Sequence, residues 1–191
     1  EKTFMKSNEK QRKDYIVSVS SREQLYALSS KEYAIQRLYL DYALFLELSE
    51  EETEELNEKY VLGIVYPRIV RKKAFKTLEE LFEKSKEIKY ALVKNLETIQ
   101  FLKNKGFAGQ IICDYTVYMC NSGSAKRLEE IAQGVCYPVE LNKGELLQIN
   151  VPTELYKEQL VYAYLPLMVT ANCLKKTTDR CGQSNKLEVI Y

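Results

Sequence analysis

Seven short apolar runs, rich in β-branched and aromatic residues, recur along this chain and constrain its fold more than any other feature. They are YIVSVS at 15–20, IQRLYLDY at 35–42, YVLGIVY at 60–66, KYALVKN at 89–95, GQIICDYTVY at 109–118, CYPVELN at 136–142 and EQLVYAYL at 158–165. Runs of this length with few internal polar residues are typical of strands buried on both faces, as in parallel sheets. We therefore predict seven mostly parallel strands.

Segments with helical spacing separate these runs and lie at 21–30, 49–60, 77–88, 95–106, 121–132 and 141–149. The predicted N-caps are Ser21, Ser49, Thr77, Asn95 and Asn121, and the predicted helix-ending glycines are Gly106 and Gly134. Such alternation predicts a βα barrel or a doubly wound sheet. We favour a seven-stranded, mostly parallel βα barrel, TIM-barrel-like and closed or open, because the units are even and no G-x-G-x-x-G turn follows the first strand.

The barrel is expected to occupy residues 15–170 as one domain. The polar residues 1–14 are interpreted as a linker or disordered terminus, and 171–191 as an irregular C-terminal extension. Because the chain stops in the apolar run LEVIY, we expect it to be a piece of a longer protein.

Charge and histidine content exclude several classes of function. Lys and Arg number 28 and Asp and Glu 27, so no overall field attracts nucleic acid or membranes, and either partner would need a local patch. With no histidine, the chain cannot build a Ser-His-Asp relay, a Cys-His pair or a His-based zinc site. No apolar run approaches the roughly 20 residues that span a bilayer. We therefore predict a soluble, cytoplasmic protein without a membrane partner.

The five cysteines are an odd number and form no C-x-x-C pair, which favours reduced thiols over a disulfide framework. Cys113 lies among apolar residues and is predicted to be core. Cys173 and Cys181 are interpreted as thiolate ligands of an iron-sulfur cluster or zinc, since soft sulfur donors suit those metals. The alternative is that Cys173 is a small buried residue and Cys181 a surface thiol.

Three carboxylates end predicted strands, where the sites of βα barrels lie. They are Asp41, Asp114 and Glu140. Glu140 is the preferred catalytic residue, because partial burial at the barrel mouth would suit it to general acid or base use. The three together would offer oxygen ligands to a divalent cation. Alternatively, each caps the next helix or pairs with a nearby cation. The same pocket is expected to include Asn95, Asn121 and Tyr164.

The densest basic run, YPRIVRKKAFK, contains Arg68, Arg71, Lys72, Lys73 and Lys76. Together with the aromatic residues beside them, these cations would grip a phosphate backbone and stack a base. The run is equally consistent with a solvated surface whose field the acidic segment 47–59 offsets. RNA is therefore a candidate partner.

Several motifs resemble, in sequence and order, the collagenase-like peptidases, which form peptidase family U thirty-two. They are LYLDY, YPRIVRK, VKNLETIQFLKNKG, DYTVYMCNSGSAKRLEEIAQG, PVELNKGEL and VYAYLPLMVTANCLKKTTDRC, which span most of residues 15–181. The most specific parts are Asn121-Ser122, Glu140-Leu141 and the Leu-Pro-Leu-Met turn before Cys173. The resemblance implies a barrel-like βα fold. It also implies either collagenase activity or a role in hydroxylating RNA or quinone precursors with an iron-sulfur cluster, for which Cys173 would be a ligand.

The chain also departs from the family pattern. Members usually carry His in the fifth strand and His-Gly in the seventh, where this chain has Asp114 and Ala163-Tyr164. Two cysteines cannot complete a four-thiolate cluster, so none is expected in this chain alone. The pattern is most similar to the C-terminal barrel-like region of a large member. We expect that member to serve in iron-sulfur-dependent RNA hydroxylation. The alternatives are a peptidase, hence a hydrolase, and a catalytically degenerate barrel that binds the other domains of its protein.

Overall fold

The computed structural model describes residues 15–30, 33–70 and 75–166. The chain divides after Leu160 into two units, and the fold below is that of the first. The whole predicted extension at 171–191, including Cys173 and Cys181, and the predicted linker at 1–14 lie outside the described residues.

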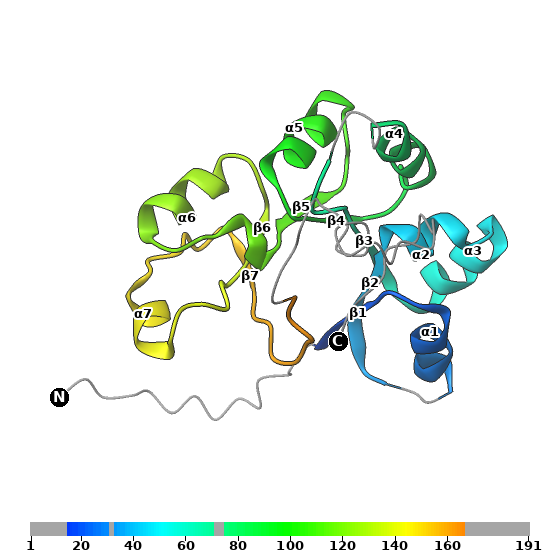
Figure 1. The fold of residues 1–191 in the computed structure, drawn as a ribbon, viewed down its shortest axis with the longest axis horizontal. Helices are drawn as coiled ribbons and strands as arrows, with labels where there is room; N and C mark the ends of the chain where they lie inside the picture. Colours follow the sequence, from blue (N-terminus) through cyan, green and yellow to red (C-terminus); the bar gives the residue numbers. More distant parts are fainter. Residues whose placement is uncertain (1–14, 31–32, 71–74, 167–191) are drawn as a thin grey trace, which may run out of the picture. The chain divides into compact units, whose positions relative to one another are not determined.

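Seven parallel strands form one sheet in chain order (Figure 1). They are β1 (Tyr15–Val19), β2 (Ile35–Asp41), β3 (Val61–Val65), β4 (Tyr90–Val93), β5 (Gln110–Cys113), β6 (Gly134–Cys136) and β7 (Tyr156–Glu158). The sheet curls into an open barrel whose edges are β1 and β7, since each pairs with one neighbour. The predicted fold class is confirmed.

Helices alternate with the strands and lie along the outer side of the curved sheet (Figure 1). They are α1 (Arg22–Ser29), α2 (Tyr42–Glu47), α3 (Glu50–Lys59), α4 (Phe75–Lys84), α5 (Leu96–Asn104), α6 (Ser122–Glu129) and α7 (Lys143–Gln148), with a 3₁₀ turn, η2, at Tyr115–Val117. Within the described residues, no helix is long and apolar enough to cross a membrane.

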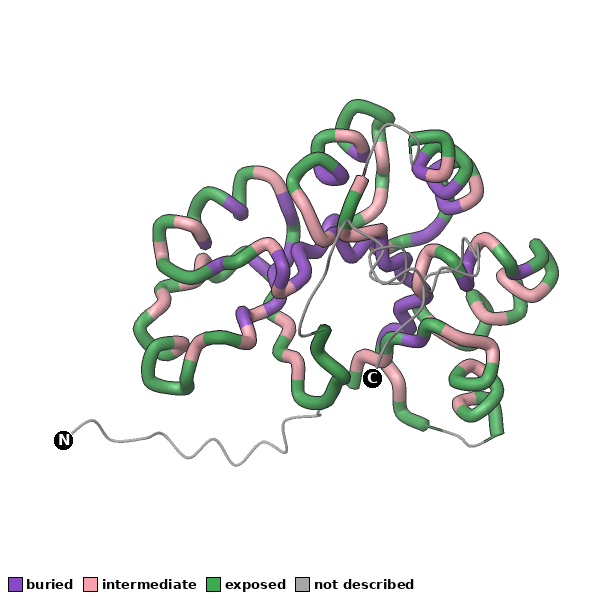
Figure 2. Tube along the Cα trace, in the orientation of Figure 1, coloured by how far each residue is buried: buried purple, intermediate pink, exposed green. Residues whose placement is uncertain are grey.

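The two faces of the sheet carry different cores, because successive side chains of a strand point to opposite faces. The outer face packs against the helices in a large apolar cluster that includes Leu40, Ile64 and Val93. The inner face carries a smaller cluster of Tyr39, Val65, Leu92 and Ile112. Burial is accordingly concentrated along the strands (Figure 2).

Local capping explains where most helices begin. Ser21, Ser49, Asn95 and Asn121 each accept a hydrogen bond from a backbone N–H in the first turn of a helix, as predicted. Thr77 was wrongly predicted as a cap, because it lies inside α4. Gly106 follows α5 with φ +73°, a conformation that suits glycine.

Strands six and seven lie earlier in the chain than predicted. β6 begins at Gly134, which therefore does not end a helix, and it stops before Pro138, whose nitrogen has no hydrogen to donate to a ladder. A Cβ at Gly134 would lie 2.7 Å from Ile112 Cδ1, so close packing of the two strands requires glycine there. β7 then pairs Tyr156 with Gly134, and the exposed residues 161–166 form no strand.

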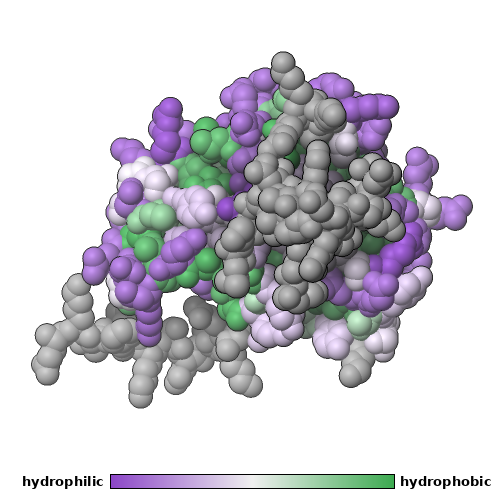
Figure 3. All heavy atoms as spheres, in the orientation of Figure 1, coloured by the Kyte–Doolittle hydropathy of each residue, from purple (hydrophilic) through white to green (hydrophobic). Residues whose placement is uncertain are grey.

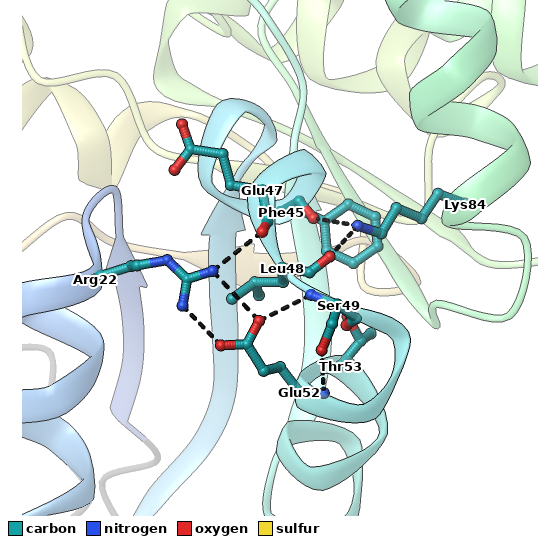
Figure 4. A network of polar contacts seen from close by, with 8 residues as sticks. All are labelled: Arg22, Phe45, Glu47, Leu48, Ser49, Glu52, Thr53 and Lys84. Carbon is teal, nitrogen blue, oxygen red and sulfur yellow. Dashed lines mark hydrogen bonds and ion pairs between the residues drawn. The ribbon is translucent and has the colours of Figure 1, made fainter.

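Helix α2 was not predicted, because Tyr42 belongs to the predicted strand run at 35–42 and the rest of the helix lies in the gap before the predicted helix at 49–60. Two cations from neighbouring helices hold its C-terminus (Figure 4). Lys84 of α4 donates to the carbonyls of Phe45, Leu46 and Leu48. Arg22 of α1 donates to the carbonyl of Glu47 and pairs with Glu52 of α3. Cations near carbonyls at a helix end are favourable, so this junction is stabilised from both sides.

Candidate functional site

Polar side chains gather where the inner face meets the carboxyl ends of the strands. Residues two positions earlier, such as Tyr39, Leu92 and Ile112, belong to the inner cluster. By alternation, Asp41, Lys94 and Asp114 extend the same face to the barrel mouth. We refer to these three residues as the mouth cluster. Backbone pairing places Lys94 and Asp114 side by side, since the Asp114 N–H donates to the Val93 carbonyl at 2.8 Å.

Asp114 is the most buried acid of the mouth cluster. Its side chain is 7% exposed and accepts a hydrogen bond from Thr116 Oγ1 at 2.9 Å. Burial raises the pKa of its carboxyl above the ordinary value of 3.8, and the charge of Lys94 opposes the rise.

Asp41 has a similar environment at the end of β2. Its carboxylate accepts a hydrogen bond from the Ala43 N–H at 3.0 Å and so caps α2. Burial raises its pKa, against the effects of the Ala43 hydrogen bond and of Lys94. Lys94 therefore acts electrostatically on both carboxyls. Both carboxyls thus combine a raised pKa with a nearby lysine charge, a combination that is frequent at functional sites.

A second polar group fills the inner face below the mouth. Arg37 of β2 reaches Glu158 of β7, with Nη1 2.6 Å from Oε1, and Tyr39 donates its hydroxyl to the same oxygen at 3.0 Å. The Arg37 guanidinium lies 3.4 Å from the centroid of the Tyr90 ring. Its Nε is buried without a hydrogen-bond partner. A Cβ at Gly63 would lie 2.6 Å from the Tyr39 ring, so that glycine makes room for the group.

Two loops at the mouth are joined by side chains. Asn95 donates from Nδ2 to the carbonyls of Pro67 and Arg68, at 3.0 and 2.9 Å, while its Oδ1 caps α5. Arg68 Nη2 in turn lies 3.4 Å from the hydroxyl of Tyr118, which follows η2. The loops after β3 and β5 are thus fixed against each other.

The structure changes the ranking of the predicted acids. Glu140 lies in the loop after β6 and is exposed, so its expected partial burial is wrong. The strand that was to carry it ends at Cys136. No group of three or more Cys, Asp or Glu side chains among the described residues is placed to hold a metal ion. The expected three-carboxylate cation site is therefore not formed there.

The remaining predicted pocket residues have separate positions. Asn95 borders the mouth and clamps a loop. Asn121 is exposed and forms a capping box with Ser124 at the start of α6. Tyr164 belongs to the second unit and is 88% exposed, with its ring edge-to-face against Tyr162.

Two of the three described cysteines do not fit an iron-sulfur site. Cys113 and Cys136 are buried, and burial raises the pKa of each thiol to about 12, which disfavours the thiolate that a cluster requires. Cys120 is exposed. The two buried thiols are therefore unsuited to hold a cluster.

Only part of the basic run can be placed. Arg68 borders the mouth, whereas Lys76 projects from α4 with its side chain 86% exposed, 3.9 Å from Glu80. Arg71, Lys72 and Lys73 lie outside the described residues. Around the unit, hydrophilic side chains project over the outer helices (Figure 3), so exposed charge is not particular to this run.

Several residues of the site were missed by sequence reasoning. Lys94 directly follows an apolar run, as Asp114 does, and this position marks it as a strand-end residue, but no role in the site was predicted for it. Glu158 was assigned to the start of a strand that it ends. The contact of Arg37 with Glu158 joins residues 121 positions apart, and no local pattern reports it.

Comparisons with known proteins add little to this geometry. No protein-family model and no curated protein matches the chain. A muconate cycloisomerase from Azorhizobium caulinodans is a structural neighbour with 12% sequence identity and a TM-score of 0.47. The match covers 66% of this chain and 38% of that protein. A likeness this weak supports no functional argument.

Proposed function

We propose that this domain is the C-terminal barrel-like region of a collagenase-like peptidase family protein, and that the protein serves in iron-sulfur-dependent RNA hydroxylation. The family motifs support the first part. The observation that carries the second is the mouth cluster, in which buried Asp114 and half-buried Asp41 flank Lys94 at the strand ends. In a βα barrel, that is the position of an active site.

The proposal assigns different tasks to different residues. Asp114, with its raised pKa, exchanges a proton with the bound nucleotide. The positive charge of Lys94 offsets the negative charges of Asp41 and Asp114. Arg68 at the rim contacts phosphate. An iron-sulfur cluster would supply redox chemistry, held by Cys173, Cys181 and cysteines outside this chain.

The test uses the full-length protein in cells that lack the endogenous copy. Hydroxylated nucleosides in total RNA are measured by mass spectrometry after complementation with wild type, Asp114→Asn or Glu140→Gln. Asp114→Asn keeps the shape of the side chain but cannot carry a proton, so we expect hydroxylation to be lost. Glu140→Gln is the matched control, because Glu140 is an exposed acid of the next loop, and we expect hydroxylation to be retained.

Iron and acid-labile sulfide are measured in the same protein purified without oxygen, beside Cys173→Ala. The proposal requires iron that the variant lacks. Iron in neither protein, together with cleavage of gelatin, would replace RNA hydroxylation with peptide hydrolysis.

A second candidate is an interaction module. It is favoured by the inner face of the sheet, where Arg37, Tyr39 and Glu158 bond to one another across the strands. A module of this kind predicts normal hydroxylation with Asp114→Asn, because the acid would then serve no chemical step. The same complementation experiment therefore separates the two candidates.

A further inference from the structure

Tyr118 has an unusual conformation for its residue type. Its φ of 58° and ψ of 61° are left-handed, and no other non-glycine residue among those described has positive φ. A bulky side chain is disfavoured there, and such outliers concentrate at functional sites. Despite this cost, the ring is not used for packing, since the residue is 50% exposed.

The surroundings hold Tyr118 firmly. Its N–H donates to the Tyr115 carbonyl at 3.2 Å, and its carbonyl accepts from the Cys120 N–H at 2.9 Å. Its hydroxyl accepts from Arg68 Nη2 at 3.4 Å. Asn95 in turn fixes the backbone of Arg68 through its carbonyl. An exposed ring is thus held beside a cation on two clamped loops.

Arg68 and Tyr118 lie at the same end of the sheet as the mouth cluster. Arg68 follows β3 and Tyr118 follows β5, so both stand at the carboxyl ends of the strands, where the mouth cluster lies. Arg68 and Asp114 are both close enough to Tyr115 to affect its pKa, so the pair lies near the mouth cluster. The exposed ring is therefore placed to contact a molecule that binds at the mouth.

We propose that Tyr118 and Arg68 form a stacking shelf that binds an unpaired RNA base next to the nucleotide at the mouth. The ring presents a π-face that accepts any base, and the guanidinium neutralises the adjoining phosphate. This inference rests on the proposed RNA function and adds the residues that hold the single strand. It assigns Tyr118 a binding task and no chemical step.

The test measures binding of fluorescent oligouridine to the full-length protein, with Tyr118→Asn as the main variant. Asparagine adopts the left-handed conformation readily, so this variant removes the ring without destabilising the fold. Loss of one stacked base lowers affinity by about 5- to 140-fold. Tyr118→Phe, which keeps the ring, retains about the wild-type affinity. Tyr26→Asn is the matched control, since Tyr26 is an equally available tyrosine on α1, 67% exposed, and it leaves binding unchanged.

An abasic oligonucleotide of the same length separates the contribution of the bases to binding from that of the sugar-phosphate backbone. The shelf predicts that wild type and Tyr118→Asn bind the abasic strand equally. An equal loss on both strands would overturn stacking, because the ring would then act on the backbone. If wild type binds oligouridine and Tyr118→Asn binds it just as well, the shelf is wrong while the RNA function stands. If wild type binds no RNA, both proposals fall.

Discussion

Two arginine–glutamate pairs in this unit have the same contact distance and opposite environments. Arg22–Glu52 and Arg37–Glu158 each bring nitrogen and oxygen to 2.6 Å. The side chains of the first pair are 37% and 41% exposed, and those of the second 5% and 11%. The pKa of Glu52 is lowered to about 2, mainly by its hydrogen bond to Arg22, whereas burial raises the pKa of Glu158 despite Arg37.

The difference shows that contact distance does not measure what an ion pair contributes. At the exposed site, the carboxylate gains a hydrogen bond to arginine and loses little of its hydration. In the barrel interior, desolvation of the charge outweighs the attraction of its partner. The exposed pair stabilises a helix junction weakly, while the buried pair costs free energy to form and is costly to break.

The largest expected effect comes from breaking the buried pair. Arg37→Met leaves Glu158 buried without its cation, and we expect the free energy of unfolding to fall by about 3–5 kcal/mol. Urea denaturation at neutral pH measures the change.

A triple variant sharpens this result. Arg37→Met with Tyr39→Phe and Glu158→Leu removes both charges and the buried hydroxyl that bonds to them, and we expect it to recover most of the stability lost by the single variant, because apolar residues of similar volume replace buried pairs well. If the triple variant is as unstable as Arg37→Met, the pair stabilises the barrel by its geometry, and the desolvation argument is wrong.

The next largest effect is that the stabilities contributed by Glu158 and Glu52 change with pH in opposite directions. Native Glu158 holds more protons than the unfolded chain between its ordinary pKa of 4.5 and its raised native value. Stability from this group is therefore greatest below pH 4.5 and falls as pH rises through that window. Native Glu52 holds fewer protons between about 2 and 4.5, so its contribution grows as pH rises across that range and is lost on acidification.

Two matched variants separate these contributions. Subtracting the pH profile of unfolding free energy of Glu158→Gln from that of wild type should leave a curve that falls with pH. The same subtraction for Glu52→Gln should leave a curve that rises. If both difference curves rise with pH, the attraction of the Arg37 charge outweighs the effect of burial on the pKa of Glu158.

The sequence predicted the architecture because that information is local. Seven apolar runs and four of the predicted caps, among them Ser49 and Asn95, depend on residues a few positions apart. The errors occurred where two local signals competed. CYPVELN has the hydrophobicity of a strand, but Pro138 prevents the ladder from continuing. IQRLYLDY has the pattern of a strand up to its end, yet its Asp41 caps helix α2, which begins at Tyr42.

The site was less predictable, because it is built across strands. Strand-end position alone identified Asp41 and Asp114, but it favoured Glu140, whose strand ends earlier than its pattern indicates. The environment of a carboxyl depends on partners that alternation places opposite it, such as Lys94. Burial, which decides the pKa of each acid, is a property of the assembled barrel.

The smallest expected effect comes from breaking the exposed pair. In Arg22→Met, Glu52 keeps its hydrogen bond from the Ser49 N–H at 2.8 Å and gains water in place of the guanidinium (Figure 4). We expect only a slight shift of the urea midpoint, and one that shrinks further in high salt, because exposed charges are screened. Lys84→Met is the matched control on the other side of α2, where the ammonium donates to three carbonyls, and it should shift the midpoint more at every salt concentration. A loss in Arg22→Met as large as that in Arg37→Met would break the comparison, since exposure would then not decide what these pairs contribute.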